Sequence, residues 1–477
     1  ADCVQVLRAQ YRQVSHERAR LMTAIAEVAL RDDADGTGRL AEPSEFAFDE
    51  VRAALVWTRR AADAQCALAL DLVRRLPAVH AALSQGAIDE PKARIFSDWT
   101  EGLADEQARA LCAGLLPGAP GWTTGQLVER IKRWAIAIDP HWAQRRYEQA
   151  IRGRRVVGSR NSDGSANLCG FDLPVGQVAT AYARIDGLAQ AAKRGGRRDP
   201  IDHIRAELFL GMTDGSYTGM DDAAILTTLL TAAEPSVPSP GSRPGARGVE
   251  VRVRLSTLLG LDRHPGELAG WGPVHAELAR SLVAQHTAGQ WRFVLTDSGG
   301  HLSGVGILRR RPTGLPRDGR AGVVEIQVPE RMLRALATQA HRSGDWAPVV
   351  AELLTHLDNA GDPAAQADPT RRLPGAALRR LVQARDRTCV FPTCRAPARN
   401  TDTDHSIEHG AGGPTIAANL GCTCRHDHRL RHDGDWQLRQ PRPGHFVWIS
   451  RLGQTYHVHP APIIEPLPHP RPREPDD

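Results

Sequence analysis

The chain has 477 residues, of which 41% are hydrophobic and 24% are charged, and its formal net charge is +5. This composition is typical of a soluble globular protein, and no apolar run approaches the roughly 20 residues of a membrane-spanning helix. The length exceeds what one hydrophobic core usually serves, so we expect two or three domains. The mild basic excess permits a polyanionic partner without demonstrating one.

The expected localisation is cytoplasmic, without membrane association. The first residues, ADCVQVLRAQ, lack the basic and apolar segments of a secretion signal. Cys3, Cys66, Cys112 and Cys169 are far apart in the sequence. This spacing argues against a disulfide framework and fits a reducing compartment.

The first third of the chain has a helical pattern. It covers residues 11–30 and resumes more strongly at Phe48, with apolar residues recurring on one helical face. Thr123 and Gln126 resemble a capping box, and Asp139-Pro140 should break the helix that follows. We expect these apolar stripes to pack against one another as a helical core.

Short strands appear from Arg155 onwards, around the hairpin signal Asp163-Gly164. A Pro/Gly/Ser-rich linker lies in the middle of the chain, and a Pro-rich segment that we expect to be disordered closes it. Two helices, an alternating strand and a second hairpin are predicted at residues 175–193, 201–210, 249–255 and 291–307.

The most specific pattern lies near the C-terminus, in RDRTCVFPTCRAPARNTDTDHSIEHGAGGPTIAANLGCTCRHDHRLRH. Cys389 and Cys394 flank four residues and predict a knuckle that presents two thiolates to one zinc ion. A second pair must come from residues 422–428. Cys424 with Asp427 would mirror the first knuckle, and Cys422 or His426 are the alternatives. The competing interpretation is a set of small buried thiols unrelated to metal.

A second site of different chemistry is predicted in the same segment. Asp404 and His405 are adjacent, so on a strand one can bind a cation while the other faces an attacking water. His428 and His432 are four residues apart and share a helical face, so they can approach one ion together. Asn419 can hydrogen-bond across the hairpin and fix the loop that carries His405. The pattern therefore predicts a strand–loop–strand–helix site for a single metal.

Arginines are frequent around this segment. They are either a surface that follows a phosphate backbone or the solvated face of an amphipathic helix. They are Arg371, Arg372, Arg379, Arg380, Arg385, Arg387, Arg395 and Arg399, and the candidates for nucleic-acid binding are Arg385, Arg387, Arg395 and Arg399.

The segment from about residue 384 to 456 resembles an HNH endonuclease domain of the ββα-metal fold, in its cysteine-bearing form. The resemblance implies that Asp404 and His428 bind a divalent ion, Mg²⁺ or Mn²⁺, with His432 where some relatives have a third ligand. It also implies that His405 is the general base and that Asn419 orients the loop. Structural zinc would be held by Cys389, Cys394, Cys424 and Asp427, and relatives usually carry His at this last position.

The preceding part, with IDEPKAR, LPVGQVATAYARIDGLA and LLGLDRHPGELAGWGP, resembles the helical domain of unknown function 222, or 13E12-repeat type. This resemblance covers about residues 45–370 and implies no settled biochemical role.

The expected fold class is α+β and multidomain, with a mainly α-helical N-terminal domain carrying short hairpins and a small zinc-stapled ββα-metal domain. The expected divisions are an N-terminal helix and loop, a helical domain, a linker, a mixed continuation, the nuclease domain and the tail. Their boundaries are residues 1–44, 45–233, 234–248, 249–370, 371–459 and 460–477.

The favoured hypothesis is a metal-dependent endonuclease that hydrolyses phosphodiester bonds of double-stranded DNA. The alternative is a zinc-stapled module that binds nucleic acid around an inactive nuclease centre. A third hypothesis makes the large N-terminal part a protein-interaction scaffold.

Overall fold

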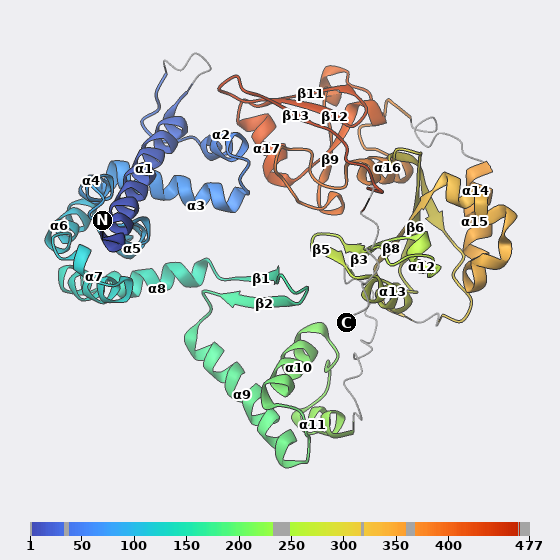
Figure 1. The fold of residues 1–477 in the computed structure, drawn as a ribbon, viewed down its shortest axis with the longest axis horizontal. Helices are drawn as coiled ribbons and strands as arrows, with labels where there is room; N and C mark the ends of the chain where they lie inside the picture. Colours follow the sequence, from blue (N-terminus) through green and yellow to red (C-terminus); the bar gives the residue numbers. More distant parts are fainter. Residues whose placement is uncertain are drawn as a thin grey trace. The chain divides into compact units, whose positions relative to one another are not determined.

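The computed structural model describes residues 2–32, 38–231, 249–315, 319–358, 368–465 and 467. The fold is mixed α+β, with a helical N-terminal region and small sheets, as expected (Figure 1). The predicted linker at 234–248 lies outside the described residues, as does most of the Pro-rich tail. No helix in the described part of the chain is long and apolar enough to cross a membrane.

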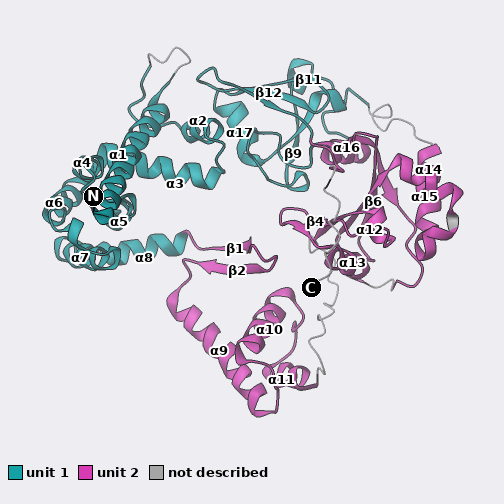
Figure 2. Cartoon of the chain, in the orientation of Figure 1, with its two compact units in different colours: residues 1–152, 368–374, 386–460 teal, residues 153–367, 375–385, 461–477 magenta. Residues whose placement is uncertain are grey.

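The chain forms two compact units that do not follow its order (Figure 2). The first contains residues 1–152, 368–374 and 386–460, and the second contains residues 153–367, 375–385 and 461–477. The earliest helices and the last strands therefore belong to the same unit.

Helices make up the N-terminal part of the first unit. The predicted capping box is confirmed, because the Thr123 side chain accepts from Gln126 N and the Gln126 side chain accepts from Thr123 N. A core that includes Leu72, Phe96 and Leu111 joins the helices. They are α1 (Cys3–Leu30), α2 (Ala47–Ala54), α3 (Arg59–Leu70), the π-helix η1 (Asp71–Arg75), α4 (Pro77–Ser84), α5 (Glu90–Thr100), α6 (Asp105–Leu115), η2 (Ala119–Gly121), α7 (Thr124–Ile138) and α8 (Trp142–Arg152).

The second unit begins with the predicted hairpin, in which β1 and β2 pair antiparallel. A separate small core holds the three helices that follow. These elements are β1 (Arg155–Arg160), β2 (Ala166–Phe171), α9 (Val175–Arg194), α10 (Ile201–Asp214) and α11 (Asp222–Thr231).

A six-stranded sheet of order β5-β4-β3-β8-β6-β7 forms the rest of the second unit. β8 lies parallel to both of its neighbours, β3 and β6, and the other pairs are antiparallel. The strands are β3 (Glu250–Arg254), β4 (Gly266–Leu268), β5 (Gly272–Val274), β6 (Gln290–Thr296), β7 (Leu302–Leu308) and β8 (Val323–Pro329). The helices are α12 (Leu255–Leu258), α13 (Ala276–Gln285), α14 (Glu330–Thr338), η3 (Ala340–Trp346), α15 (Ala347–Asp358) and α16 (Ala376–Asp386), whose last residue belongs to the first unit.

The C-terminal part of the first unit runs strand, strand, helix and then a three-stranded antiparallel sheet of order β11-β12-β13. Its core contains Phe391, Trp436 and Trp448, joined by Phe46 and Ala53 from the N-terminal helices. The elements are η4 (Ala398–Asn400), β9 (Asp402–His405), η5 (His409–Ala411), η6 (Ala417–Asn419), β10 (Leu420–Thr423), α17 (Arg425–Asp433), β11 (Gln437–Arg442), β12 (His445–Ile449) and β13 (Thr455–Val458).

Candidate metal and catalytic sites

Two strands and a helix assemble the first candidate site. β9 and β10 pair antiparallel, with His405 opposite Leu420 and Asp404 opposite Gly421. The chain then enters α17 at Cys424, whose thiol caps the helix by accepting from the backbone N–H of Asp427. The sequence therefore brings the end of β9 close to one face of α17.

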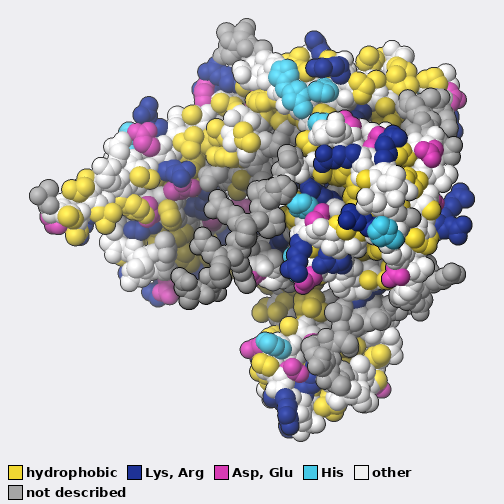
Figure 3. Space-filling model, turned by 45° about the vertical axis from the view of Figure 1, so that its right-hand side comes forward, with side chains coloured by type: hydrophobic (Ala, Val, Ile, Leu, Met, Phe, Trp, Pro, Cys, Tyr) yellow, Lys and Arg dark blue, Asp and Glu magenta, His cyan; other side chains and the backbone are white. Residues whose placement is uncertain are grey.

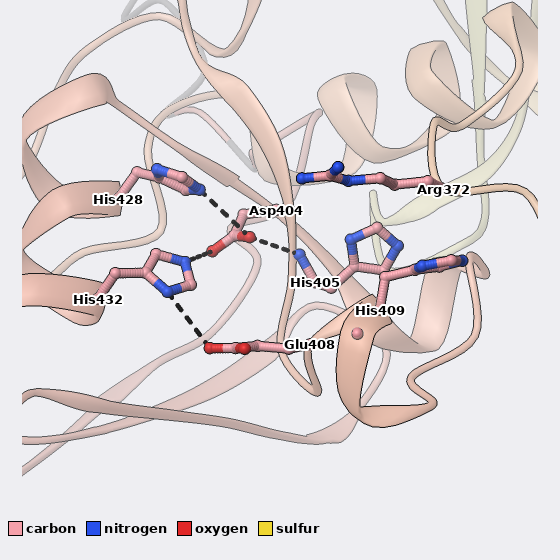
Figure 4. A pocket seen from close by; sticks show the side chains of 8 residues that line it. Arg372, Asp404, His405, Glu408, His409, His428 and His432 are labelled. Carbon is pink, nitrogen blue, oxygen red and sulfur yellow. Dashed lines mark hydrogen bonds and ion pairs between the residues drawn. The ribbon is translucent and has the colours of Figure 1, made fainter.

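Asp404 faces two histidines of α17. Its Oδ1 is 3.5 Å from Nε2 of His428, and its Oδ2 is 3.9 Å from Nε2 of His432. Potential ligand atoms of these three residues all lie within 4.8 Å of one another, the spacing of a group that could hold one metal ion. Figure 4 shows both histidines on one side of Asp404 and His405 on the other.

Electrostatics favour an ionised carboxylate at this position. Burial alone would raise the pKa of Asp404, but the interactions with His428 and with the charge of Arg431 hold it below its ordinary value. The same contact with Asp404 raises the pKa of His428, against the opposing effect of burial. An anionic oxygen and imidazole nitrogens are both suitable ligands for divalent ions.

The His405 side chain is buried and faces the same pocket. Its Nε2 is 2.8 Å from Oγ1 of Thr415, and burial lowers the pKa of its imidazole. The pocket has a volume of about 520 Å³. It is lined by Arg372, Asp404, His405, Glu408, His409, Gly410, His428 and His432.

Asn419 fixes the loop between the two strands, through the cross-hairpin contact that the sequence predicted. Its Nδ2 donates to the carbonyl oxygens of Ile407 at 2.9 Å and Pro414 at 3.0 Å, and its Oδ1 accepts from the backbone N–H of Ile407 at 2.7 Å. Gly413 is required for this close packing, because a Cβ there would lie 1.9 Å from the Ile407 carbonyl oxygen.

The sequence patterns did not mark two charged residues of this site. Arg431 is partly buried and donates from Nη1 to Oδ2 of Asp404 at 2.7 Å and from Nη2 to the carbonyl oxygen of Ser406 at 2.7 Å. Glu408 lies 3.3 Å from Nδ1 of His432 through its Oε1. Arg431 stands three residues after His428, so the helical spacing used for the histidines could have identified it.

A second cluster holds Cys389, Cys394, Cys424 and Asp427, whose potential ligand atoms also lie within 4.8 Å of one another. Oδ2 of Asp427 is 3.2 Å from Sγ of Cys389 and 3.1 Å from Sγ of Cys424. Sγ of Cys394 is 4.0 Å from Sγ of Cys424. Three sulfur donors and one oxygen donor suit a closed four-coordinate metal site.

The thiols of the cluster differ in pKa because their surroundings differ. Burial raises the pKa of Cys389 well above its ordinary value, whereas hydrogen bonds from Cys389 and Cys394 hold the pKa of Cys424 far below it. Such a depressed pKa favours the thiolate, which is the form that binds metal.

The two alternative ligands are placed elsewhere. Cys422 is buried in β10, outside the cluster. His426 points its Nε2 to Oδ2 of Asp49 at 2.9 Å. Asp49, His426 and Asp427 are close enough to form a third group that could hold a metal ion. However, Arg52 already donates to the carboxylates of Asp49 and Asp427.

The predicted nucleic-acid-binding arginines do not line the described pocket. Arg395 is exposed, and Arg387 and Arg399 are partly buried, in the first unit. Arg385 belongs to the second unit. The arginine that lines the pocket is Arg372, which is exposed.

We expect Asn419→Ala to loosen the loop at residues 406–415, because it removes three part-buried hydrogen bonds to the loop backbone. The local opening free energy should fall by about 1–3 kcal/mol, and hydrogen exchange in this loop should accelerate at least about fivefold. Asn400→Ala, at an exposed asparagine of the same unit, is the control. Equal exchange in the two variants would contradict this role of Asn419.

The N-terminal part of the chain matches one known protein family. Residues 5–200 match the family described as "Domain of unknown function (DUF222)". The resemblance was expected over about residues 45–370, so the match begins earlier and ends earlier than expected. The match ends ahead of the C-terminal candidate sites. No solved structure matches the chain.

Similar proteins occur in mycobacteria. "Uncharacterized protein Rv2100" of Mycobacterium tuberculosis (strain ATCC 25618 / H37Rv) is 28% identical over 94% of this chain and 75% of its own length. "Uncharacterized protein Rv1945" of the same strain is 33% identical over 23% of each chain. "Uncharacterized protein Mb1179c" of Mycobacterium bovis is 32% identical over 20% of this chain and 22% of its own.

Proposed function

We propose that the chain is an HNH-type, or ββα-metal, endonuclease that hydrolyses phosphodiester bonds of double-stranded DNA with one divalent ion. The observation that carries this proposal is the single pocket in which Asp404 faces two histidines of α17 on one side and His405 lies on the other. Hydrolysis of a phosphodiester needs an activated water, charge neutralisation at the phosphate and help for the departing oxygen.

Asp404, His428 and His432 would hold the ion. An ion bound there would neutralise negative charge on the phosphate and on the departing 3′ oxygen. A carboxylate suits Mg²⁺ and Mn²⁺, whereas imidazole nitrogen favours transition-metal ions over Mg²⁺. The donor set therefore favours Mn²⁺ of the two. Glu408, next to Nδ1 of His432, would orient that ring in the way that carboxylates orient metal-binding histidines.

His405 acts as the general base in this proposal. If its Nε2–H donates to Thr415, its Nδ1 carries the lone pair that accepts a proton from water. The water oxygen then attacks phosphorus, the P–O3′ bond breaks, and the departing oxygen takes a proton from solvent. Asn419 holds the loop that follows His405 and so preserves the position of the base.

Substrate contact is assigned to exposed arginines. Arg372 lines the pocket and would contact a phosphate oxygen of the substrate, and Arg395 offers a further positive charge in the same unit. Figure 3 shows lysine and arginine side chains interspersed with acidic and apolar ones on the face that it draws. We therefore propose that these arginines contact the phosphate backbone of DNA. Such contacts are independent of base sequence and weaken as the salt concentration rises.

One observation favours the alternative, a nucleic-acid-binding module with an inactive centre. The Arg431 guanidinium lies 2.7 Å from Oδ2 of Asp404, so a positive charge already occupies one side of the carboxylate that would hold the ion. This leaves Oδ1, on the His428 side, as the oxygen more accessible to a metal.

The experiment that separates the two functions is nicking of supercoiled plasmid DNA. The wild-type chain should nick in Mg²⁺ or Mn²⁺ and lose activity on chelation. His405→Ala should lower the rate by about 10²–10⁴-fold, the usual contribution of a general base. His457→Ala, at an exposed histidine of β13, is the matched control and should retain the wild-type rate. DNA binding without nicking by the wild type would support the alternative, and equal nicking by wild type and His405→Ala would refute the assigned base.

We further propose that the cysteine cluster binds structural zinc. Thiolates are the preferred protein ligands of zinc in closed sites, and a carboxylate oxygen can complete the tetrahedron. Zinc would stabilise this region by linking the loop after α16 to the start of α17.

Metal analysis of the purified chain should find about one equivalent of zinc per chain. Cys394→Ser should lose most of it, because it removes one of three thiolates. Cys422→Ser changes a buried cysteine outside the cluster, so it should retain the metal. Less than about half an equivalent in the wild type would contradict zinc binding.

A further inference from the structure

An arginine from the N-terminal helices reaches the cysteine cluster. Arg52 of α2 is only 2% exposed. Its Nη1 donates to Oδ1 of Asp427 at 2.8 Å and to Oδ1 of Asp49 at 2.9 Å. Its guanidinium lies 4.4 Å from the ring centre of Phe391, which belongs to the loop between Cys389 and Cys394. Arg52 thus contacts both halves of the cluster.

The two oxygens of Asp427 have different partners. Oδ1 accepts from Arg52, and Oδ2 faces the thiols of Cys389 and Cys424. Asp427 is fully buried, so neither oxygen can turn to water. The contact with Arg52 therefore fixes which oxygen faces the metal-binding thiols.

The charge balance of the cluster also favours Arg52 as the partner of Asp427. Three thiolates and one carboxylate carry more negative charge than a zinc ion neutralises, and excess charge is costly in a buried place. The guanidinium of Arg52 supplies positive charge directly against the carboxylate. Partners of this kind orient metal-binding side chains, and their loss typically weakens metal affinity by about 10–100-fold.

Helix α2 is joined to the C-terminal part of its unit by further contacts. Oδ2 of Asp49 is 2.9 Å from Nε2 of His426, and Oε1 of Glu50 accepts from the backbone N–H of Leu452 at 3.1 Å. Phe46, just before α2, is buried in the same core as Cys389. Helix α2 is therefore bonded directly to the segments on both sides of Asp427.

We propose that Arg52 is a positioning residue for a metal ion in the cysteine cluster, so that metal binding and docking of α2 onto the C-terminal segment stabilise each other. This inference rests on the zinc binding proposed above and is independent of nuclease activity. It makes Asp427 a ligand that, through its bond to Arg52, links the DUF222 region to the C-terminal segment.

Zinc affinity of the full chain, measured by competition with a chromogenic chelator, tests this role. Arg52→Gln should weaken zinc binding by about 10–100-fold. Arg451→Gln is the matched control, because Arg451 also joins the two segments, through the carbonyl oxygens of Arg31 and Val28, but bonds to none of the four residues of the cluster in the described part of the chain. It should leave zinc affinity within about twofold of wild type. Equal loss in both variants, or no loss in Arg52→Gln, would overturn the proposal.

A measurement on the wild-type chain covers the case in which Arg52→Gln does not fold. Hydrogen exchange is followed in α2 and α9 before and after zinc is removed by chelation. Exchange in α2 should accelerate, whereas α9, in the other unit, should be unchanged. Unchanged exchange in α2 refutes the coupling, as does a wild-type chain that binds no zinc. A chain that binds zinc and shows the coupling but does not nick DNA leaves this proposal standing while the nuclease proposal fails.

Discussion

The ionised carboxylate of Asp404 is the group on which the candidate catalytic site depends. One oxygen faces His428 and the backbone N–H of His405, and the other faces Arg431 and His432. Arg431, which with His428 helps to keep the carboxylate ionised, also donates to the backbone carbonyls that follow Asp404 and so holds the end of β9 in place. The same contact would limit metal binding, because a divalent ion bound here would share Asp404 with a guanidinium.

Sequence patterns predicted the elements whose determinants are local. Examples are the capping box of α7, the hairpin of β1 and β2, and the strand–strand–helix order around Asp404. Each is determined by residues that are close in the sequence, so their spacing can be read from the sequence itself. The interaction of Asn419 with the loop after His405 was foreseen for the same reason.

What the sequence could not predict arises from contacts between distant segments. Arg52 and Asp427 are separated by 375 positions, and periodicity gives no information about such a pair. The sequence predicts Asp427 as a zinc ligand beside Cys424 but gives no sign that Arg52 binds it. Glu408 and Thr415 were likewise unmarked, because a glutamate and a threonine in a loop are usually solvated. Their proximity to His432 and His405 depends on how the loop folds back.

The division of the chain has a related consequence. The sequence predicts a separate domain at residues 371–459. The core around Phe391, however, includes Phe46 and Ala53 from the start of the chain. The N-terminal helices and the C-terminal sites thus share one compact unit, while residues 153–367 form most of the other. Contacts within that first unit connect the DUF222 region to the cysteine cluster, and through α17 to the histidines beside Asp404.

The location of a bound divalent ion tests the central claim most directly. Crystals of the chain soaked with Mn²⁺ would reveal the ion by its anomalous scattering. Our account predicts a peak within bonding distance of Asp404 and His428, with the ring of His405 facing the same pocket and not bound to the ion. A peak at other residues, or no peak in this pocket at saturating Mn²⁺, would contradict it.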